Sequence, residues 1–194
     1  MEIALSQAHT GGRADTDLIR RMARGDEAAL QELYAQYGRR LYAYALRLTG
    51  QPALAEEVLQ DSLLAAWQGA RRFRGESRLL TWLLGIVHHQ ACARLRRLHP
   101  SLPLDEAEPL LAPEGPEGHA EHADRARLLR EGLQSLSRDH RAVLELVFYL
   151  GLSLAEVAQV CGCPVGTVKS RLSYGRAHLR RLLERAGLCA EDAL

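Results

Sequence analysis

A proline-rich segment divides the sequence into two parts. Residues 99–123 contain five prolines and two glycines, and they carry several acidic residues but no lysine or arginine. Proline lacks the backbone N–H that a helix needs, and its ring clashes with the preceding turn. We therefore predict a flexible acidic linker at 100–123. The other predicted segments are a disordered tail at 1–14, a first domain at 15–99, a second domain at 124–187 and a tail at 188–194.

Apolar residues recur every three or four positions on both sides of this linker. That spacing places them on one face of an α-helix, and no alternating run is long enough to indicate a strand. We expect an all-α chain of two small helical domains. Its helices are predicted from Asp15, across Leu30–Leu48, at about 53–69, at about 79–98, across Leu128–Leu136, after Ser137, from Leu154, and at about 165–186.

Charge is distributed unevenly along the chain. The net charge is only +1, but Arg94–Arg97 and Lys169–Arg185 are strongly basic. The acidic linker offsets the charge of these two basic patches, so the net charge does not reveal them. No apolar run approaches the ~20 residues of a membrane span, and the N-terminus lacks the pattern of a secretory signal. These features predict a soluble cytoplasmic protein without membrane insertion, whose cysteines stay mostly reduced.

Residues 153–173 have the layout of a helix-turn-helix. Ser153–Glu156 forms a capping box that starts a short helix, Cys161–Cys163 forms the turn, and a longer helix follows. Polar and basic side chains on that second helix suit base edges and phosphates in the major groove. We call them the recognition face: Thr167, Lys169, Ser170, Arg171, Ser173, Tyr174 and Arg176.

Two further surfaces are predicted on the first domain. The acidic face comprises Glu57, Gln60, Asp61, Leu64 and Trp67. The basic-aromatic surface comprises Phe73, Arg74, Arg78, Trp82, Arg94, Arg96 and Arg97. Aromatic rings among cations suit unstacked single-stranded bases. The alternative for Phe73 and Trp82 is packing in the core. A duplex-binding domain beside a single-strand platform indicates a protein that opens DNA.

These motifs resemble the extracytoplasmic-function (group 4) sigma factors of bacterial RNA polymerase, over nearly the whole chain from Asp15 to Leu183. The matching segments follow the family's order: Gly25–Leu30 and Leu54–Asp61 for regions 2 and 2.2, Thr81–Ile86 with Arg94–Arg97 for regions 2.3 and 2.4, and Pro164–Leu172 for region 4.2. The last match is the most specific.

The resemblance implies a partner and a role for each surface. The acidic face would bind the β′ clamp helices of core RNA polymerase, with Asp61 as its main residue, and the β flap is a further expected partner. The basic-aromatic surface, to which the resemblance adds His88 and His89, would melt the −10 element and hold its non-template strand. The recognition face would bind the −35 element as duplex. An anti-sigma factor is the expected regulator. His89 and Ala93 stand where the family often has Asn and Asp, which affects the −10 sequence preference.

Other interpretations remain open on the residues alone. A conventional dimeric helix-turn-helix regulator would use residues 15–99 for dimerisation or ligand binding, but it needs neither first-domain surface. An adaptor that sequesters an anti-sigma factor would be expected to lack the recognition face. We predict no enzyme, no catalytic residue and no cofactor, because no phosphate loop or nucleophile motif occurs. No metal site is expected from His88, His89 and Cys92, and Cys161–Cys163 is too closely spaced for an unstrained disulfide.

Overall fold

The computed structural model describes residues 12–98, 128–129, 131–133 and 135–186. Within these ranges every regular element is helical, which confirms the predicted all-α class. The first domain contains α1 (Gly12–Ala23), α2 (Glu27–Thr49), α3 (Pro52–Gly69), a 3₁₀ turn (Ala70–Arg72) and α4 (Leu79–Leu98). The second contains helical residues at 128–129 and 131–133, α6 (Arg138–Leu144), a π-helical turn (Glu145–Tyr149), α7 (Leu154–Cys161) and α8 (Val165–Arg185). The predicted linker and C-terminal tail lie outside the described residues.

Local capping sets the helix boundaries of the first domain. The Asp26 carboxylate accepts a hydrogen bond from the Ala28 N–H and caps the start of α2. Gly50 ends α2 in the left-handed conformation, with φ of 67°, and its N–H donates to the Leu46 carbonyl. Pro52 then occupies the first turn of α3, where the missing N–H costs nothing. The bounds of α3 and α4 agree closely with the sequence prediction.

Residues 12–14 were predicted to be the end of a disordered tail. They are helical instead, because α1 begins at Gly12. The Thr16 hydroxyl donates to the Gly12 carbonyl across the first turn. The Tyr37 hydroxyl on α2 donates to the Asp15 carboxylate at 2.7 Å. Polar contacts therefore stabilise this first turn. Such contacts produce no apolar periodicity, so the sequence pattern did not predict the helix here.

The helix-turn-helix is built as its sequence predicts. The Ser153 hydroxyl accepts from the Glu156 N–H, and the Glu156 carboxylate accepts from the Ser153 N–H, which completes the capping box of α7. Gly162 ends α7 in the left-handed conformation, with φ of 63°. Ser137 precedes α6, but its hydroxyl contacts His140 and makes no capping hydrogen bond. The π-helical turn after α6 has no counterpart in the prediction.

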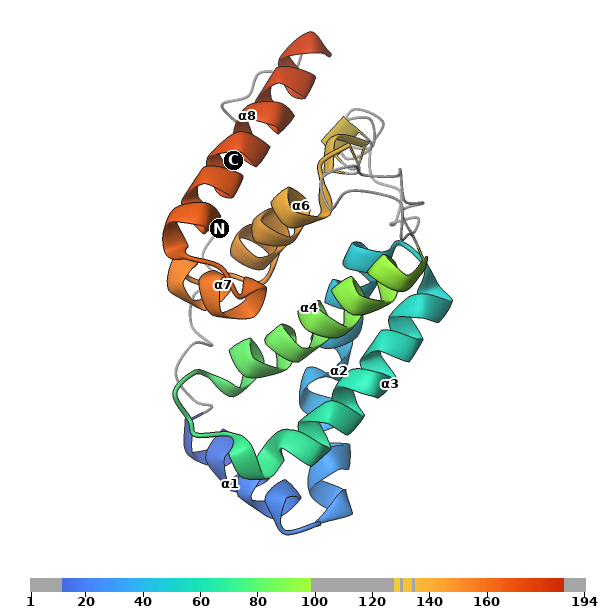
Figure 1. Cartoon of the computed structure of the whole chain (residues 1–194), viewed down its shortest axis with the longest axis vertical. Coiled ribbons are helices and arrows are strands. Elements are labelled where there is room, and N and C mark those ends of the chain that lie inside the picture. Colours follow the sequence, from blue (N-terminus) through green and yellow to red (C-terminus); the bar gives the residue numbers. More distant parts are fainter. Residues whose placement is uncertain (1–11, 99–127, 130, 134, 187–194) are drawn as a thin grey trace, which may run out of the picture.

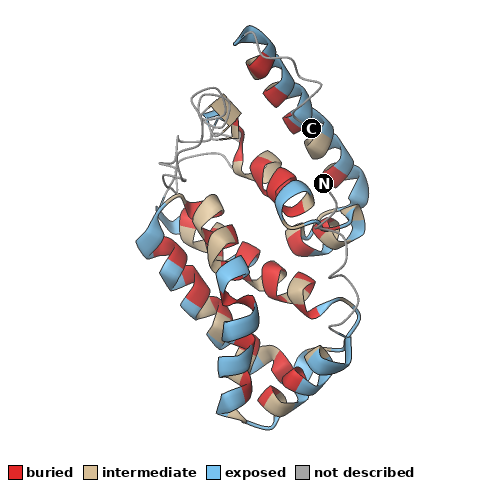
Figure 2. Cartoon of the chain, turned by 180° about the vertical axis from the view of Figure 1, so that it is seen from behind, coloured by how far each residue is buried: buried red, intermediate tan, exposed pale blue. Residues whose placement is uncertain are grey.

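The two domains lie against each other and share one core. The larger apolar cluster contains buried residues of all four long helices of the first domain together with Val143, Leu146, Val157, Val160 and Val168 of the second. Helix α7 packs along α4, and Figure 1 shows the second domain covering one side of α4. Buried positions line the facing sides of these helices (Figure 2). Leu136, Leu144 and Leu179 form a smaller cluster between α6 and α8.

Candidate nucleic-acid interfaces

The acidic face lies along the outer side of α3, as its spacing predicts. Glu57, Gln60 and Leu64 are exposed, and 55% of the Leu64 surface is accessible. Asp61 and Trp67 are half-buried beside them. The acidic face therefore presents one exposed apolar side chain beside two carboxylates.

Arg94 reaches from α4 to two carboxylates of the acidic face. Its guanidinium lies 2.6 Å from Glu57 Oε2 and 2.6 Å from Asp61 Oδ2. The hydrogen bond and charge of Asp61 raise the pKa of Arg94. Arg94 was predicted on the basic-aromatic surface, but its side chain turns toward α3. Arg94 therefore belongs geometrically to the acidic face.

A groove that the sequence did not predict lies next to the acidic face. It has a volume of about 1030 Å³ and lies between α2 and α3, lined by Tyr34, Gly38, Tyr42, Gln60 and Leu63 among others. The Tyr34 ring borders this groove, and 54% of the Tyr34 surface is exposed. A Cβ at Gly38 would lie 2.8 Å from Tyr34 Cδ2. Gly38 lies one helical turn after Tyr34 and leaves room for its ring. A glycine inside a long helix was the one sequence feature that could have indicated this position of the ring.

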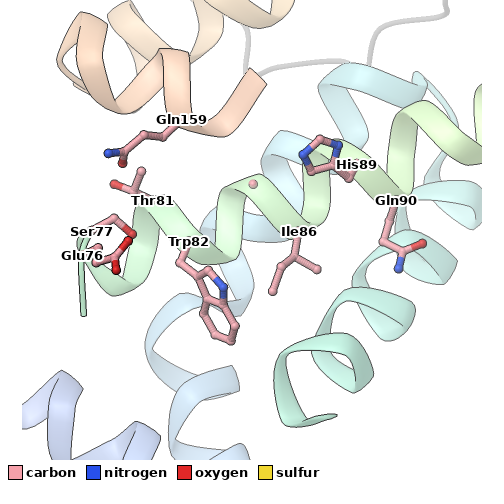
Figure 3. A pocket seen from close by; sticks show the side chains of 9 residues that line it. Glu76, Ser77, Thr81, Trp82, Ile86, His89, Gln90 and Gln159 are labelled. Atoms are coloured by element: carbon pink, nitrogen blue, oxygen red, sulfur yellow. The ribbon is translucent and has the colours of Figure 1, made fainter. Parts of the chain in front are cut away.

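Phe73 and Trp82 form the centre of the basic-aromatic surface. Their ring centroids are 4.9 Å apart and the rings are tilted by 47°. Both rings are half-buried, so they pack on the domain and still face solvent. An open pocket of about 530 Å³ adjoins Trp82 along α4, where Ser77, Thr81, His89 and Gln90 line it (Figure 3). Gln159 from α7 lies on its other side, which no first-domain motif could reveal.

The remaining members of this surface divide into exposed and buried groups. Arg74, Arg78, His89, Arg96 and Arg97 are exposed. His88 is only 7% exposed, and its Nδ1 lies 2.9 Å from the Tyr44 hydroxyl. Burial, with the charge of His89, lowers the pKa of His88 to about 4. His88 was predicted to contact DNA, but in this arrangement its side chain is part of the core.

The recognition face lies on the first half of α8. Lys169, Ser170, Ser173, Tyr174 and Arg176 are exposed, and Thr167 is half-buried. The Tyr174 ring lies 4.5 Å from that of His140, so its position is fixed from α6. These side chains form one polar, basic stripe of the kind that enters a DNA groove.

Arg171 differs from the rest of the recognition face. Its guanidinium pairs with the Asp139 carboxylate at the start of α6, and Nη1 lies 3.9 Å from the Cys163 sulfur. This side chain ties α8 to α6 and to the turn of the helix-turn-helix. Its contribution to the recognition face is therefore to hold the other side chains in position.

The cysteines at the domain contact are poor nucleophiles. Burial raises the pKa of the Cys161 thiol to about 12, and it also raises that of Cys92. The thiolate is the reactive form, so neither sulfur is activated. Among the described residues, no three histidine, cysteine or acidic side chains converge as metal ligands. In the same residues, no helix is long and apolar enough to span a bilayer.

The fold and these surfaces define a class of two-domain helical DNA-binding protein. Comparison with known families agrees with the division of the chain: residues 33–99 match the model for sigma-70 region 2, and residues 126–179 match that for sigma-70 region 4. The chain belongs to the extracytoplasmic-function RNA polymerase sigma factors, and it directs transcription initiation. The dimeric regulator is not favoured by these matches.

Several relatives match nearly the whole chain. The sigma factor SigM of Mycobacterium tuberculosis is 34% identical over 174 residues, which cover 88% of this chain and 85% of SigM. SigL of the same organism is 34% identical over 168 residues, covering 86% of this chain and 95% of SigL. RpoE from Bartonella quintana, solved with the anti-sigma factor NepR, has a TM-score of 0.63 at 26% identity and covers 79% of this chain and 96% of its own. CnrH, solved with the cytosolic domain of CnrY, has a TM-score of 0.65 at 26% identity over 89% and 98% of the two chains.

Proposed function

We propose that each surface serves one step of initiation. The acidic face binds the β′ clamp helices of core RNA polymerase, and the second domain also contacts the β flap. The recognition face binds the −35 duplex, and the basic-aromatic surface opens the −10 element and holds its non-template strand. The protein acts in the cytoplasm and performs no chemistry itself. The observation that carries the proposal is the presence of the acidic face and the exposed recognition face in one chain.

Helix α3 is suited to a helical, cationic partner. Leu64 supplies an exposed apolar anchor, and Asp61 and Glu57 supply negative charge one and two turns away, respectively. Arg94 already neutralises both carboxylates at the surface, where ion pairs contribute only ~0–1 kcal/mol. A cationic side chain of the partner displaces so weak an interaction at little cost. The neighbouring groove at Tyr34 extends the apolar part of the interface.

Strand opening is assigned to the aromatic pair. The tilted rings of Phe73 and Trp82 are partly exposed beside an open pocket, and stacking contributes ~1–3 kcal/mol per base. Exposed arginines on the same surface neutralise phosphates of the separated strand. Since melted bases need a site that duplex DNA does not occupy, this surface favours the open state of the promoter.

An anti-sigma partner is proposed from the solved relatives. RpoE, which shares 26% identity with this chain, was solved with the anti-sigma factor NepR. A partner that covers the acidic face would exclude core polymerase. The exposed Leu64 and Tyr34 side chains offer it apolar contacts.

Run-off transcription with core polymerase tests the proposal. We expect promoter-specific transcripts with the wild-type protein and a loss of at least about tenfold with Asp61→Arg, because the new cation faces a cationic partner and Arg94. Asp17→Arg makes the same charge change at an exposed position of α1 and should retain full activity. Duplex binding without core binding or transcripts would contradict the sigma-factor assignment and favour the regulator.

A further inference from the structure

A side chain of α6 contacts the recognition face. The centre of the His140 ring lies 4.5 Å from that of the Tyr174 ring on α8, and the two rings are tilted by 41°. Tyr174 itself is 53% exposed. An exposed tyrosine on a helix surface can occupy more than one rotamer. The His140 ring therefore limits the positions that the Tyr174 hydroxyl can take on the DNA-binding side of α8.

A contact with the preceding turn orients His140. The Ser137 hydroxyl lies 2.6 Å from His140 Nδ1. A serine directly before a helix ordinarily caps it by accepting a hydrogen bond from a backbone N–H of the first turn. Ser137 stands directly before α6 but makes no such hydrogen bond. Its hydroxyl instead orients the imidazole ring that contacts Tyr174.

Close packing fixes the distance between the two helices at this point. Helices α6 and α8 lie side by side (Figure 1). Gly175 directly follows Tyr174 and is buried, and a Cβ added there would lie 2.8 Å from Leu144 Cδ1 on α6. On the other side of His140 along α6, Asp139 pairs with Arg171. An apolar contact and an ion pair therefore flank the two rings and hold them together.

A tyrosine that is held in place is suited to base recognition. Its ring can contact a thymine methyl group, and its hydroxyl can bond to a base edge. A side chain that is already ordered also loses less conformational entropy on binding than a free one. Lys169 and Arg176, which are exposed on the same face, suit phosphates, whose recognition carries no sequence information. Tyr174 is therefore the candidate for sequence discrimination among these three residues.

We propose that His140 is a positioning residue for −35 recognition. With Ser137 it fixes the Tyr174 ring, and Tyr174 discriminates between base pairs at one position or two adjacent positions of the element. This inference rests on the proposed function of the recognition face. His140 acts through Tyr174 and does not itself contact DNA. Part of the −35 sequence preference of this protein then resides in α6, outside the recognition helix.

The test uses holoenzyme assembled from core polymerase and the full-length chain. Its templates derive from one promoter fragment that the wild-type holoenzyme transcribes, with the −35 element randomised and a barcode in the transcribed region of each template. Sequencing of the run-off transcripts then gives the base preference at every −35 position. The variants are His140→Ala, Tyr174→Ala, the two combined, Ser137→Ala, and His140→Phe, which retains a ring against Tyr174.

We expect His140→Ala to weaken the base preference about threefold to tenfold, the range for one aromatic contact or one immobilised side chain. Tyr174→Ala should weaken the preference at the same positions by at least as much. The double variant should match Tyr174→Ala, because His140 acts only through that ring. Ser137→Ala should have a smaller effect at those positions, and His140→Phe should retain most of the preference.

His178→Ala is the matched control. His178 lies on α8 with its Nε2 2.7 Å from the Ser135 hydroxyl, so it is also a histidine of the second domain that contacts a serine. It does not belong to the recognition face, and its replacement should leave every base preference unchanged. Circular dichroism shows whether each variant is folded, and His140→Gln replaces His140→Ala if the latter is not.

A uniform loss of transcripts from all templates, with unchanged base preferences, would show that His140 supports only the fold, and would overturn the proposal. So would a weakened preference at positions other than those affected by Tyr174→Ala, or a further loss in the double variant. Failure of the sigma-factor function itself is seen separately, as an absence of promoter-specific transcripts with the wild-type holoenzyme.

Discussion

The burial of His88 makes the stability of the protein depend on pH. Its ring is buried against Tyr44, and its pKa is lowered to about 4 from 6.5, so the folded state holds it neutral. Between these pH values the unfolded chain binds a proton that the folded chain does not. The free energy of unfolding therefore falls as the pH falls through this window, by up to about 3 kcal/mol.

Urea denaturation across that window, compared with His88→Asn, measures this dependence. The asparagine amide can retain a hydrogen bond to Tyr44 but cannot titrate, so its stability should change less as the pH falls. Burial raises the pKa of Glu145, which acts in the opposite direction, and both proteins share that contribution. Identical pH dependence in the two proteins would show that His88 does not titrate as its burial implies.

Residue roles on the basic-aromatic surface could be predicted only in part from the sequence. The types and spacing of Phe73, Trp82 and the arginines indicated a nucleic-acid surface, and the rings do meet. The positions of His88 and Arg94 could not be predicted, because the direction of a helical side chain depends on which neighbouring helix covers it. Arg94 turns toward the carboxylates of α3, and His88 turns toward Tyr44.

Element boundaries were predictable where local chemistry sets them. Gly50 with Pro52 separates α2 from α3, and Ser153 with Glu156 starts α7, each through contacts within a few residues. The π-helical turn at Glu145–Tyr149 was not predictable in this way. Glu145 and Tyr149 in this turn both contact Arg47 on α2. Glu145 lies 98 residues from Arg47 along the chain, so local sequence does not indicate the contact.

The capping box of α7 gives a prediction at the scale of one element. Ser153→Ala removes the acceptor for the Glu156 N–H and should lower the free energy of unfolding by about 1 kcal/mol. Ser153→Thr keeps the hydroxyl and should remain close to wild type. Thermal unfolding of the two variants measures the difference. Equal losses would mean that the hydroxyl does not stabilise the helix start.

The contact between the domains is a property of the whole molecule that periodicity does not reveal. The sequence shows that α4 and α7 each carry apolar residues, but not that they cover each other. The proline-rich segment predicted two helical domains, but it did not indicate that they pack against each other. Val157 and Val160 are fully buried in a core that includes residues of the first domain, so neither domain's sequence alone accounts for their burial.

A shared core predicts shared unfolding. Small cooperative units unfold in one step, whereas independent domains give separate transitions. Because the larger core and the Arg47–Glu145 pair join the domains, calorimetry of the wild-type chain should show a single transition.

The double variant Arg47→Ala with Glu156→Gln removes that pair and the pair of Glu156 with Arg78 on the first domain. In this variant the transition should divide into two, since each domain then unfolds independently at its own temperature. Arg21→Ala with Glu32→Gln should keep one transition, because that ion pair lies within the first domain. Two transitions in the wild-type chain would mean that the domain contact is too weak to couple their unfolding.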